Sequence, residues 1–278
     1  MADVEWRWLR GWSEDEVSAR LERAAPLPLN FEAAEEEMTL ENGWHQVESQ
    51  AVIAHERPGA PSGDDAFARL KLAVTRLGFS DPRVVHGHFD ALAPLQGRPV
   101  LLELKSMGLH YLCPVRIGAV RSGEEDERTV FGFRFDTLQG HIEAGREWFM
   151  LSKDHSSGEL RFHIKASWRE GQFPNWWSQL GFKLMGRRYQ RAWHHLAHAR
   201  LRDLLRTGRL DRRARDGEVP LADLKLERKP VQFYSQRGLG RRLGGVEREV
   251  ERMSRGTPAY GLTEGSKVSS RPPETLQR

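Results

Sequence analysis

The chain has 278 residues, a net charge of +4, 38% hydrophobic residues and one cysteine. A lone cysteine excludes an internal disulfide, and no stretch approaches the roughly 20 apolar residues of a membrane-spanning helix. The N-terminal residues MADVEWRWLRGWSEDE contain early acidic residues and no apolar run, which is unlike a secretory signal. We therefore expect a cytoplasmic protein.

Charge is divided unevenly along the chain. Residues 174–278 contain 23 Lys and Arg against 11 Asp and Glu, whereas residues 1–173 contain 20 against 28. A basic C-terminal part is typical of proteins that touch polyanions or anionic lipid. A solvated helix face followed by a charged tail has the same composition, so both interpretations stay open.

The first third of the chain predicts two helices and one strand. Ser13 to Glu16 form a capping-box pattern, which predicts a helix ending near residue 25, before Pro26. Alternation over residues 47–53 weakly predicts a strand, and a Pro- and Gly-rich loop follows it. Apolar residues at helical spacing then predict a helix over residues 64–77.

Five further strands and one long helix follow. The strands are predicted at residues 99–106, 111–119, 131–136, 145–152 and 160–168, with a hairpin turn over 154–158 between the last two. A helical pattern with a basic polar face then runs over residues 175–207. The apolar face of a strand meander must be buried against another element, and this helix is the expected partner.

This order predicts an α+β fold in which an antiparallel β-sheet wraps around a long C-terminal helix. The chain divides into a lead-in segment with a helix (1–43), a helix-grip domain (44–208) and a basic, largely disordered tail (209–278). Within the tail, residues 246–255 have the composition of a short charged helix.

The segment FGFRFDTLQGHIEAGREWF, residues 131–149, resembles the signature of an uncharacterised family known as domain of unknown function nineteen-ninety. The matching positions are Thr137, Leu138, Gly140, His141, Glu143, Gly145, Glu147 and Phe149. Three positions depart from the family pattern: Asp136 replaces a Gly, Arg146 replaces a Glu, and Trp168-Arg169-Glu170 stands where Ser-Arg-Pro is common. The resemblance implies the START-like, birch-pollen-allergen-like superfamily, whose helix-grip fold often encloses a hydrophobic ligand, although this family itself has no established activity.

The connection from Thr137 to Glu147 is the first candidate site. Its glycines permit sharp turns, so His141, Glu143 and Glu147 could converge near one end of the sheet. Such a group could anchor the polar head of a ligand or transfer protons. The third interpretation is a structural connection, in which His141 and the acids satisfy loop backbone groups or pair with Arg134 or Arg116.

A set of aromatic residues is the second candidate site. It suits either an apolar pocket or a filled core, and it consists of Phe131, Phe133, Phe135, Phe162, Trp168 and Trp193. Tyr111 and Trp148 are placed at the mouth of such a pocket.

Other chemistry finds weaker support. The sequence predicts no cofactor and no metal site, since His194, His195 and His198 lack a third ligand and are interpreted as surface histidines of a basic helix. Cys113 is expected to be a small buried hydrophobe. Tyr189, Trp193, Phe233 or Tyr234 could stack on bases if the basic region bound nucleic acid.

The sequence therefore favours a protein that binds a small apolar molecule between its sheet and its last helix. The alternatives are an adaptor that binds polyanions or anionic membranes through the basic helix and tail, and an enzyme that uses His141 with Glu143 or Glu147. The oligomeric state is not predicted.

Overall fold

A computed structural model describes residues 3–106, 108–208, 225–226 and 231–234. The helices are α1 (Glu14–Ala24), α2 (Ala66–Thr75), α3 (Trp176–Thr207) and the short 3-10 helix η1 (Glu35–Glu37). The strands are β1 (Glu5–Trp8), β2 (His45–His55), β3 (Val85–His88), β4 (Pro99–Ser106), β5 (Leu109–Glu125), β6 (Arg128–Thr137), β7 (Glu143–Asp154), β8 (Glu159–Glu170), β9 (Lys225–Leu226) and β10 (Gln232–Tyr234).

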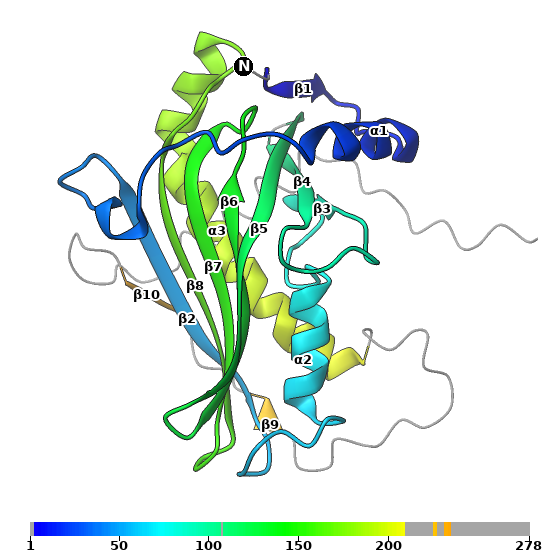
Figure 1. Ribbon diagram of the computed structural model, residues 1–278, viewed down its shortest axis with the longest axis vertical. Coiled ribbons are helices and arrows are strands. Elements are labelled where there is room, and N and C mark those ends of the chain that lie inside the picture. Colours follow the sequence, from blue (N-terminus) through cyan, green and yellow to red (C-terminus); the bar gives the residue numbers. More distant parts are fainter. Residues whose placement is uncertain (1–2, 107, 209–224, 227–230, 235–278) are drawn as a thin grey trace, which may run out of the picture.

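All strands belong to one antiparallel sheet. The order along it is β10-β2-β8-β7-β6-β5-β4-β3, with β1 paired to β5 and β9 paired to β2. The sheet curves, and α3 runs diagonally across it (Figure 1). The predicted α+β helix-grip architecture is confirmed.

Local signals in the sequence explain where the long helices begin and end. The hydroxyl of Ser13 accepts the backbone N–H of Glu16, and the Glu16 carboxylate accepts that of Ser13, which completes the predicted capping box of α1. At the start of α3, Asn175 Oδ1 accepts the Ser178 N–H at 2.8 Å. The helix ends at Gly208, whose φ of 59° is left-handed.

A filled core occupies the space between the sheet, α2 and the second half of α3. Its centre is a cluster of packed aromatic rings, in which Phe79 lies 4.7 Å from Phe149 and 5.5 Å from Phe162, centroid to centroid. Phe133 and Trp193 complete this cluster. Aromatic packing of this kind fixes the position of α3 on the sheet.

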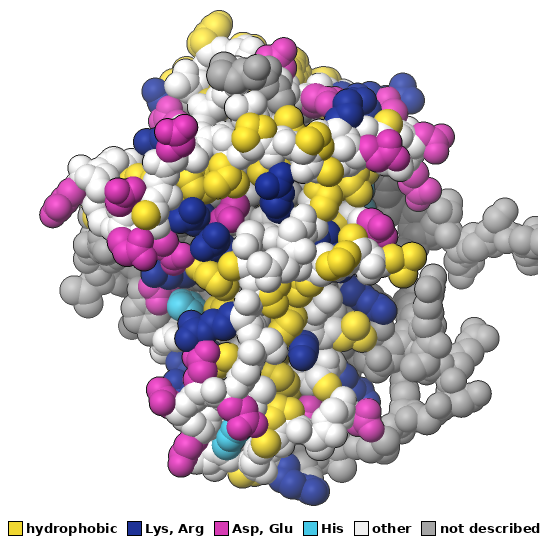
Figure 2. Space-filling model, in the orientation of Figure 1, with side chains coloured by type: hydrophobic (Ala, Val, Ile, Leu, Met, Phe, Trp, Pro, Cys, Tyr) yellow, Lys and Arg dark blue, Asp and Glu magenta, His cyan; other side chains and the backbone are white. Residues whose placement is uncertain are grey.

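The segment before β2 lies along the sheet. β1 pairs with β5, α1 packs against the far face of β4 and β5 through Leu101 and Leu112, and Leu29 bridges to Leu138. The surface turned to the viewer in Figure 2 mixes acidic, basic and hydrophobic side chains.

The sequence prediction missed several short strands. The predicted strand at 111–119 extends to residue 125, and β1, β3, β9 and β10 were not expected. β1 and β3 have four residues each and lie at the edge of the sheet, so neither shows a sustained alternating pattern. The expected charged helix at 246–255 and most of the tail lie outside the described residues.

No helix within the described ranges combines the length and the apolar character needed to cross a bilayer.

Candidate functional site

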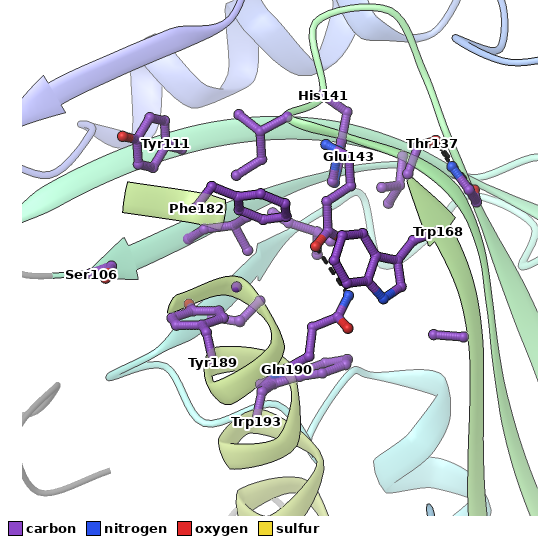
Figure 3. Close-up of a pocket in the computed structure, with 18 of the residues that line it drawn as sticks. Ser106, Tyr111, Thr137, His141, Glu143, Trp168, Phe182, Tyr189, Gln190 and Trp193 are labelled. Atoms are coloured by element: carbon purple, nitrogen blue, oxygen red, sulfur yellow. Dashed lines mark hydrogen bonds between the residues drawn. The ribbon is translucent and has the colours of Figure 1, made fainter. Parts of the chain in front are cut away.

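A cavity of about 220 Å³ lies between the sheet and the first half of α3. Strands β4 to β8 supply one wall and α3 supplies the other, as Figure 3 shows. Most lining side chains are apolar or aromatic; they include Leu102, Leu104, Leu109, Val115, Phe135, Ile142, Trp168, Phe173, Phe182, Tyr189 and Trp193. The aromatic core described above closes the space toward the second half of α3.

The structure brings most of the predicted site residues to this cavity. Its lining includes Tyr111, Phe135, Thr137, His141, Glu143, Glu147, Trp168 and Trp193. Phe131, Phe133 and Phe162 instead lie in the filled core. The predicted aromatic set thus divides between a pocket and a core, because one strand contributes to both along its length.

Thr137 anchors the turn that carries the polar residues. Its hydroxyl donates to Asn30 Oδ1 at 2.6 Å and accepts the Gly145 N–H at 2.8 Å. A Cβ at Gly145 would lie 2.1 Å from the Ser167 carbonyl oxygen, so only glycine permits this close approach of β7 to β8. Thr137 and Gly145 together hold the start of β7 against β6 and β8.

His141 is buried at the cavity wall, with 3% of its surface exposed. Its Nδ1 accepts the backbone N–H of Glu143 at 2.9 Å, and burial lowers its pKa to about 4. The ring is therefore neutral near pH 7 and orders the turn. Of the two structural alternatives for His141, the structure shows the contact with a loop backbone group. It does not show pairing with Arg134 or Arg116, because Arg134 binds Asp136 and Arg116 donates to backbone carbonyls of the lead-in segment.

Glu143 and Glu147 form the polar side of the cavity. Glu143 accepts a hydrogen bond from Gln190 Nε2 of α3 at 3.0 Å, which Figure 3 shows. Glu147 Oε1 lies 3.1 Å from His194 Nε2. Burial raises the pKa of each carboxyl to about 8, and the proximity of Glu147 adds to the rise at Glu143. Both carboxyls are therefore largely protonated near neutral pH and can donate hydrogen bonds.

A buried chain of polar groups continues from Glu147 under α3. His194 Nδ1 lies 2.8 Å from Ser49 Oγ of β2, which lies 3.0 Å from His198 Nε2. Burial lowers the pKa of His194 to about 3 and that of His198 well below its ordinary value. The interpretation of these two residues as surface histidines was wrong, since neither is exposed to solvent. The small Ser49 leaves room for both rings, and its hydroxyl bridges them.

Asp136 and Arg146, two positions singled out in the sequence, contact each other. Asp136 and Arg146 face each other across β6 and β7, with Arg146 Nε 3.3 Å from Asp136 Oδ1. Arg134 also binds Asp136, at 2.8 Å. A Cβ at Gly118 would collide with Asp136 Oδ2, so the bulge in β5 makes room for this carboxylate. Asp136 and Arg146 therefore form one buried ion pair.

Other predicted positions have structural partners. Tyr111 joins β5 to α3 through its hydroxyl, 2.8 Å from Ser178 Oγ. Trp148, expected at the pocket mouth, instead donates its indole N–H to Glu35 at 3.2 Å, away from the cavity. The hydroxyl of Tyr189 donates to the Val84 carbonyl at 2.7 Å, so this ring is not free to stack on bases. Cys113 is fully buried as expected, which raises the pKa of its thiol to about 12.

Sequence reasoning missed the cavity residues on and just before α3. Phe173, Trp177, Phe182 and Gln190 line the space. Phe182 belongs to the apolar stripe of the helical pattern, which signals a buried face, but only the fold shows that this part of the face meets a void.

A family profile described as Domain of unknown function (DUF1990) matches residues 30–199, a range that includes the whole Thr137 to Glu147 connection and most of α3. The chain belongs to this family. No curated protein matches this DUF1990 chain.

Several solved structures are similar to this DUF1990 protein. Ara h 8.0201 is 11% identical, with 59% of this chain and 99% of that chain covered and a TM-score of 0.33. Major latex-like protein 151 from Panax ginseng is 19% identical, with 55% and 98% covered and a TM-score of 0.29. An uncharacterised protein from Rhizobium leguminosarum is 13% identical, with 59% and 97% covered and a TM-score of 0.30.

Proposed function

We propose that this DUF1990 protein binds a small, mainly apolar molecule in the cavity between the sheet and the first half of α3. The supporting observation is the composition of the cavity walls. Apolar and aromatic side chains surround a space of about 220 Å³, while Glu143, Glu147 and Gln190 meet on one side of it. Small-molecule pockets typically combine apolar walls with a few placed polar groups.

The protonation of the two carboxyls selects the kind of ligand. Because burial favours the neutral acids, Glu143 and Glu147 offer O–H donors to a ligand carbonyl, ether or hydroxyl oxygen. A ligand carboxylate would bring an unpaired negative charge into this buried region, where the two neutral acids do not compensate it. The preferred ligand is therefore a neutral apolar molecule with at least one hydrogen-bond acceptor.

Binding of the neutral fluorophore N-phenylnaphthylamine tests this proposal. Gly181 lines the cavity, and a Cβ there meets nothing within 4 Å, so the side chain of Gly181→Leu occupies part of the cavity without a backbone collision. Gly123 also has open space at its Cβ but is exposed on β5 and outside the cavity, which makes Gly123→Leu the matched control.

We expect wild type and Gly123→Leu to bind the fluorophore with the same affinity, and Gly181→Leu to bind at least tenfold more weakly. The melting temperature of each variant reports whether it is folded. Equal binding by all three proteins would place the fluorophore elsewhere and count against the cavity. An absence of binding to wild type would count against an accessible apolar site.

A second candidate function, contact with a membrane surface, is favoured by apolar residues beside the cavity. We define the mouth patch as the exposed side chains at the start of α3 and around β1: Trp6, Trp8, Leu9, Trp176, Trp177, Leu180 and Leu184. The rings of Trp6 and Trp177 are in edge-to-face contact at 5.4 Å, and Trp177 also lines the cavity. Trp side chains beside basic residues such as Lys183 are typical of proteins that lie on membranes.

Sedimentation with vesicles tests this second function. We expect wild type to bind vesicles that contain anionic lipid, and Trp176→Ser combined with Leu184→Ser to bind much more weakly. Leu92→Ser removes an even more exposed side chain, 94% accessible, from the loop between β3 and β4, and should change nothing. Binding by none of the proteins, or by all equally, would remove the mouth patch as a membrane contact.

Two sequence-based alternatives stay predictions. Polyanion binding through the basic helix and tail involves residues 183–278, and most of those after residue 208 lie outside the described ranges. Proton transfer by His141 would need its second ring nitrogen, because Nδ1 already accepts a backbone N–H.

A further inference from the structure

A second group of polar side chains lies at the edge of the sheet, on the face opposite the cavity. His86 and His88 are two residues apart on β3, so both project to the same side of the strand. His86 is paired in register with Glu103 of β4. Their neighbours Val85, Leu102 and Leu104 line the cavity, so the two histidines and Glu103 point the other way.

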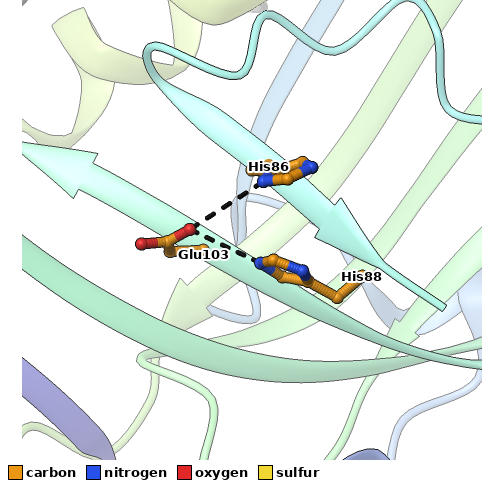
Figure 4. Close-up of side chains that lie close together, drawn as sticks. All are labelled: His86, His88 and Glu103. Atoms are coloured by element: carbon orange, nitrogen blue, oxygen red, sulfur yellow. Dashed lines mark hydrogen bonds and ion pairs between the residues drawn. The ribbon is translucent and has the colours of Figure 1, made fainter. Parts of the chain in front are cut away.

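The three side chains converge on one point, as Figure 4 shows. One potential ligand atom from each residue lies within 4.8 Å of the other two. His88 Nε2 is 3.4 Å from Glu103 Oε2, and His86 Nδ1 is 4.0 Å from the same oxygen. A tetrahedral zinc ion about 2.0–2.1 Å from each ligand separates the ligand atoms by roughly 3.3–3.4 Å. The observed separations need only a small side-chain rotation to reach this geometry.

A fourth residue, His110, orients the Glu103 carboxylate through its other oxygen. Glu103 is buried, and its other oxygen, Oε1, accepts a hydrogen bond from His110 Nδ1 of β5 at 2.7 Å. This leaves Oε2 directed toward His86 and His88. A hydrogen bond that orients a liganding carboxylate is the usual second layer of a metal site.

Lys105 is the group that competes with a cation. Its Nζ lies 3.5 Å from Glu103 Oε2 and also donates to the Pro82 carbonyl at 3.1 Å. A bound metal would replace the lysine as the partner of Oε2 while Lys105 keeps its bond to Pro82. The His86 side chain is 49% accessible, which gives an ion a route from solvent.

We propose that His86, His88 and Glu103 form a binding site for one divalent transition-metal ion, with His110 as the positioning residue for Glu103. Two imidazoles and one carboxylate with an open fourth position are a ligand set that suits zinc, whereas calcium and magnesium prefer oxygen ligands alone. The site joins the edge strand β3 to β4 and is separate from the cavity.

Titration of the full chain with cobalt, used as a coloured substitute for zinc, tests the site. The protein must carry no affinity tag and must first be treated with a chelator. The matched control is His163→Gln, because His163 on β8 is also partly exposed and also faces a carboxylate, Glu48 at 2.9 Å. All 11 histidines of the chain lie in the described residues, so each competing histidine can be tested by name.

We expect wild type and His163→Gln to bind one cobalt ion with visible absorption typical of four-coordination, and zinc to displace it. His86→Gln and His88→Gln should lose this absorption while keeping the melting temperature of the metal-free protein. His110→Gln should weaken zinc binding about 10- to 100-fold without abolishing it, as expected for a residue of the second layer.

Two results would overturn the proposal. One is that wild type binds no cobalt or zinc at equimolar protein and metal. The other is that His86→Gln and His88→Gln bind as tightly as His163→Gln, which would place the metal elsewhere. His86 is half-exposed, so its replacement leaves the fold intact even if the His88 variant is unstable.

Discussion

At the scale of single residues, the polar side of the cavity is a set of neutral groups held in an apolar environment. Glu143 and Glu147 carry raised pKa values, and His141 and His194 carry lowered ones, in each case mainly because of burial. Neutral acids and neutral imidazoles bond to one another with little net charge in the interior. This arrangement explains how so many ionisable groups lie between a sheet and a helix.

The same groups make stability depend on pH. The folded pKa of Glu143 and Glu147 is about 8 against an ordinary 4.5, so the folded state binds more protons between these values. Their contribution is complete below pH 4.5 and is lost as pH rises through 8. His141 and His194 act in the opposite direction, but only below their ordinary value of 6.5. Between pH 6.5 and 8 the carboxyls therefore dominate.

We predict that the free energy of unfolding falls from pH 6.5 to 8, by about 1 kcal/mol per pH unit for each carboxyl. Glu147→Gln should reduce this slope by roughly half, whereas Glu124→Gln, at an exposed position on β5, should leave it unchanged. Urea unfolding at several pH values measures the slope. An identical slope in wild type and Glu147→Gln would show that Glu147 is already ionised in the fold.

The buried ion pair of Asp136 and Arg146 predicts that substitutions at the two positions have coupled effects on stability. Asp136→Asn or Arg146→Gln alone should destabilise the protein by about 1–3 kcal/mol, because each leaves a buried charge short of a partner. The double variant should lose less than the sum of the two, by about 1 kcal/mol.

The exposed pair of Arg121 and Glu125, at 2.7 Å, is the control for this cycle and should show coupling below about 0.5 kcal/mol. Strict additivity for Asp136 and Arg146 would mean that Arg134 alone satisfies Asp136.

At the scale of elements, α3 has two different roles along its length. Its second half packs on the aromatic core, while its first half covers the cavity and exposes Trp176 and Leu184. The first half therefore has fewer packing contacts with the sheet, and its order depends more on the Asn175 cap and on the bond between Tyr111 and Ser178.

We predict that Asn175→Ala lowers stability by about 1 kcal/mol and accelerates amide hydrogen exchange in the first turns of α3. Ser13→Ala removes the corresponding cap of α1 and should accelerate exchange there without affecting α3. Fluorophore affinity should fall for Asn175→Ala only, since α3 supplies one wall of the cavity. Unchanged exchange in both helices would contradict a role of these caps.

Helices and strands whose periodic pattern extends over many residues could be predicted from the sequence. Short elements, and contacts that depend on distant parts of the chain, could not. The alternation of β8 and the helical pattern of α3 each extend over many residues. His194 and His198 were misplaced because a polar residue on a helix is assigned to solvent unless its partner is known, and Ser49 lies far away in the sequence. The convergence of His86 and His88 with Glu103 likewise depends on the register of an unpredicted strand.

At the scale of the whole molecule, the two faces of the antiparallel sheet carry different features. The face toward α3 encloses the aromatic core and the cavity, and the opposite face carries α1 and the histidines of β3. The glycines and polar residues from Thr137 to Glu147 predicted that His141, Glu143 and Glu147 converge near one end of the sheet, and all three line the cavity. The volume of the space could not be predicted, because a filled core and a pocket have the same aromatic composition.

Mass spectrometry under native conditions, on intact protein taken directly from the cells that produce it, tests whether the cavity holds a small molecule. We expect a fraction of wild-type molecules to carry the added mass of one small organic compound, which is released on unfolding and is absent from Gly181→Leu but present in Gly123→Leu. A wild-type protein without added mass, which also fails to take up N-phenylnaphthylamine, would contradict this expectation.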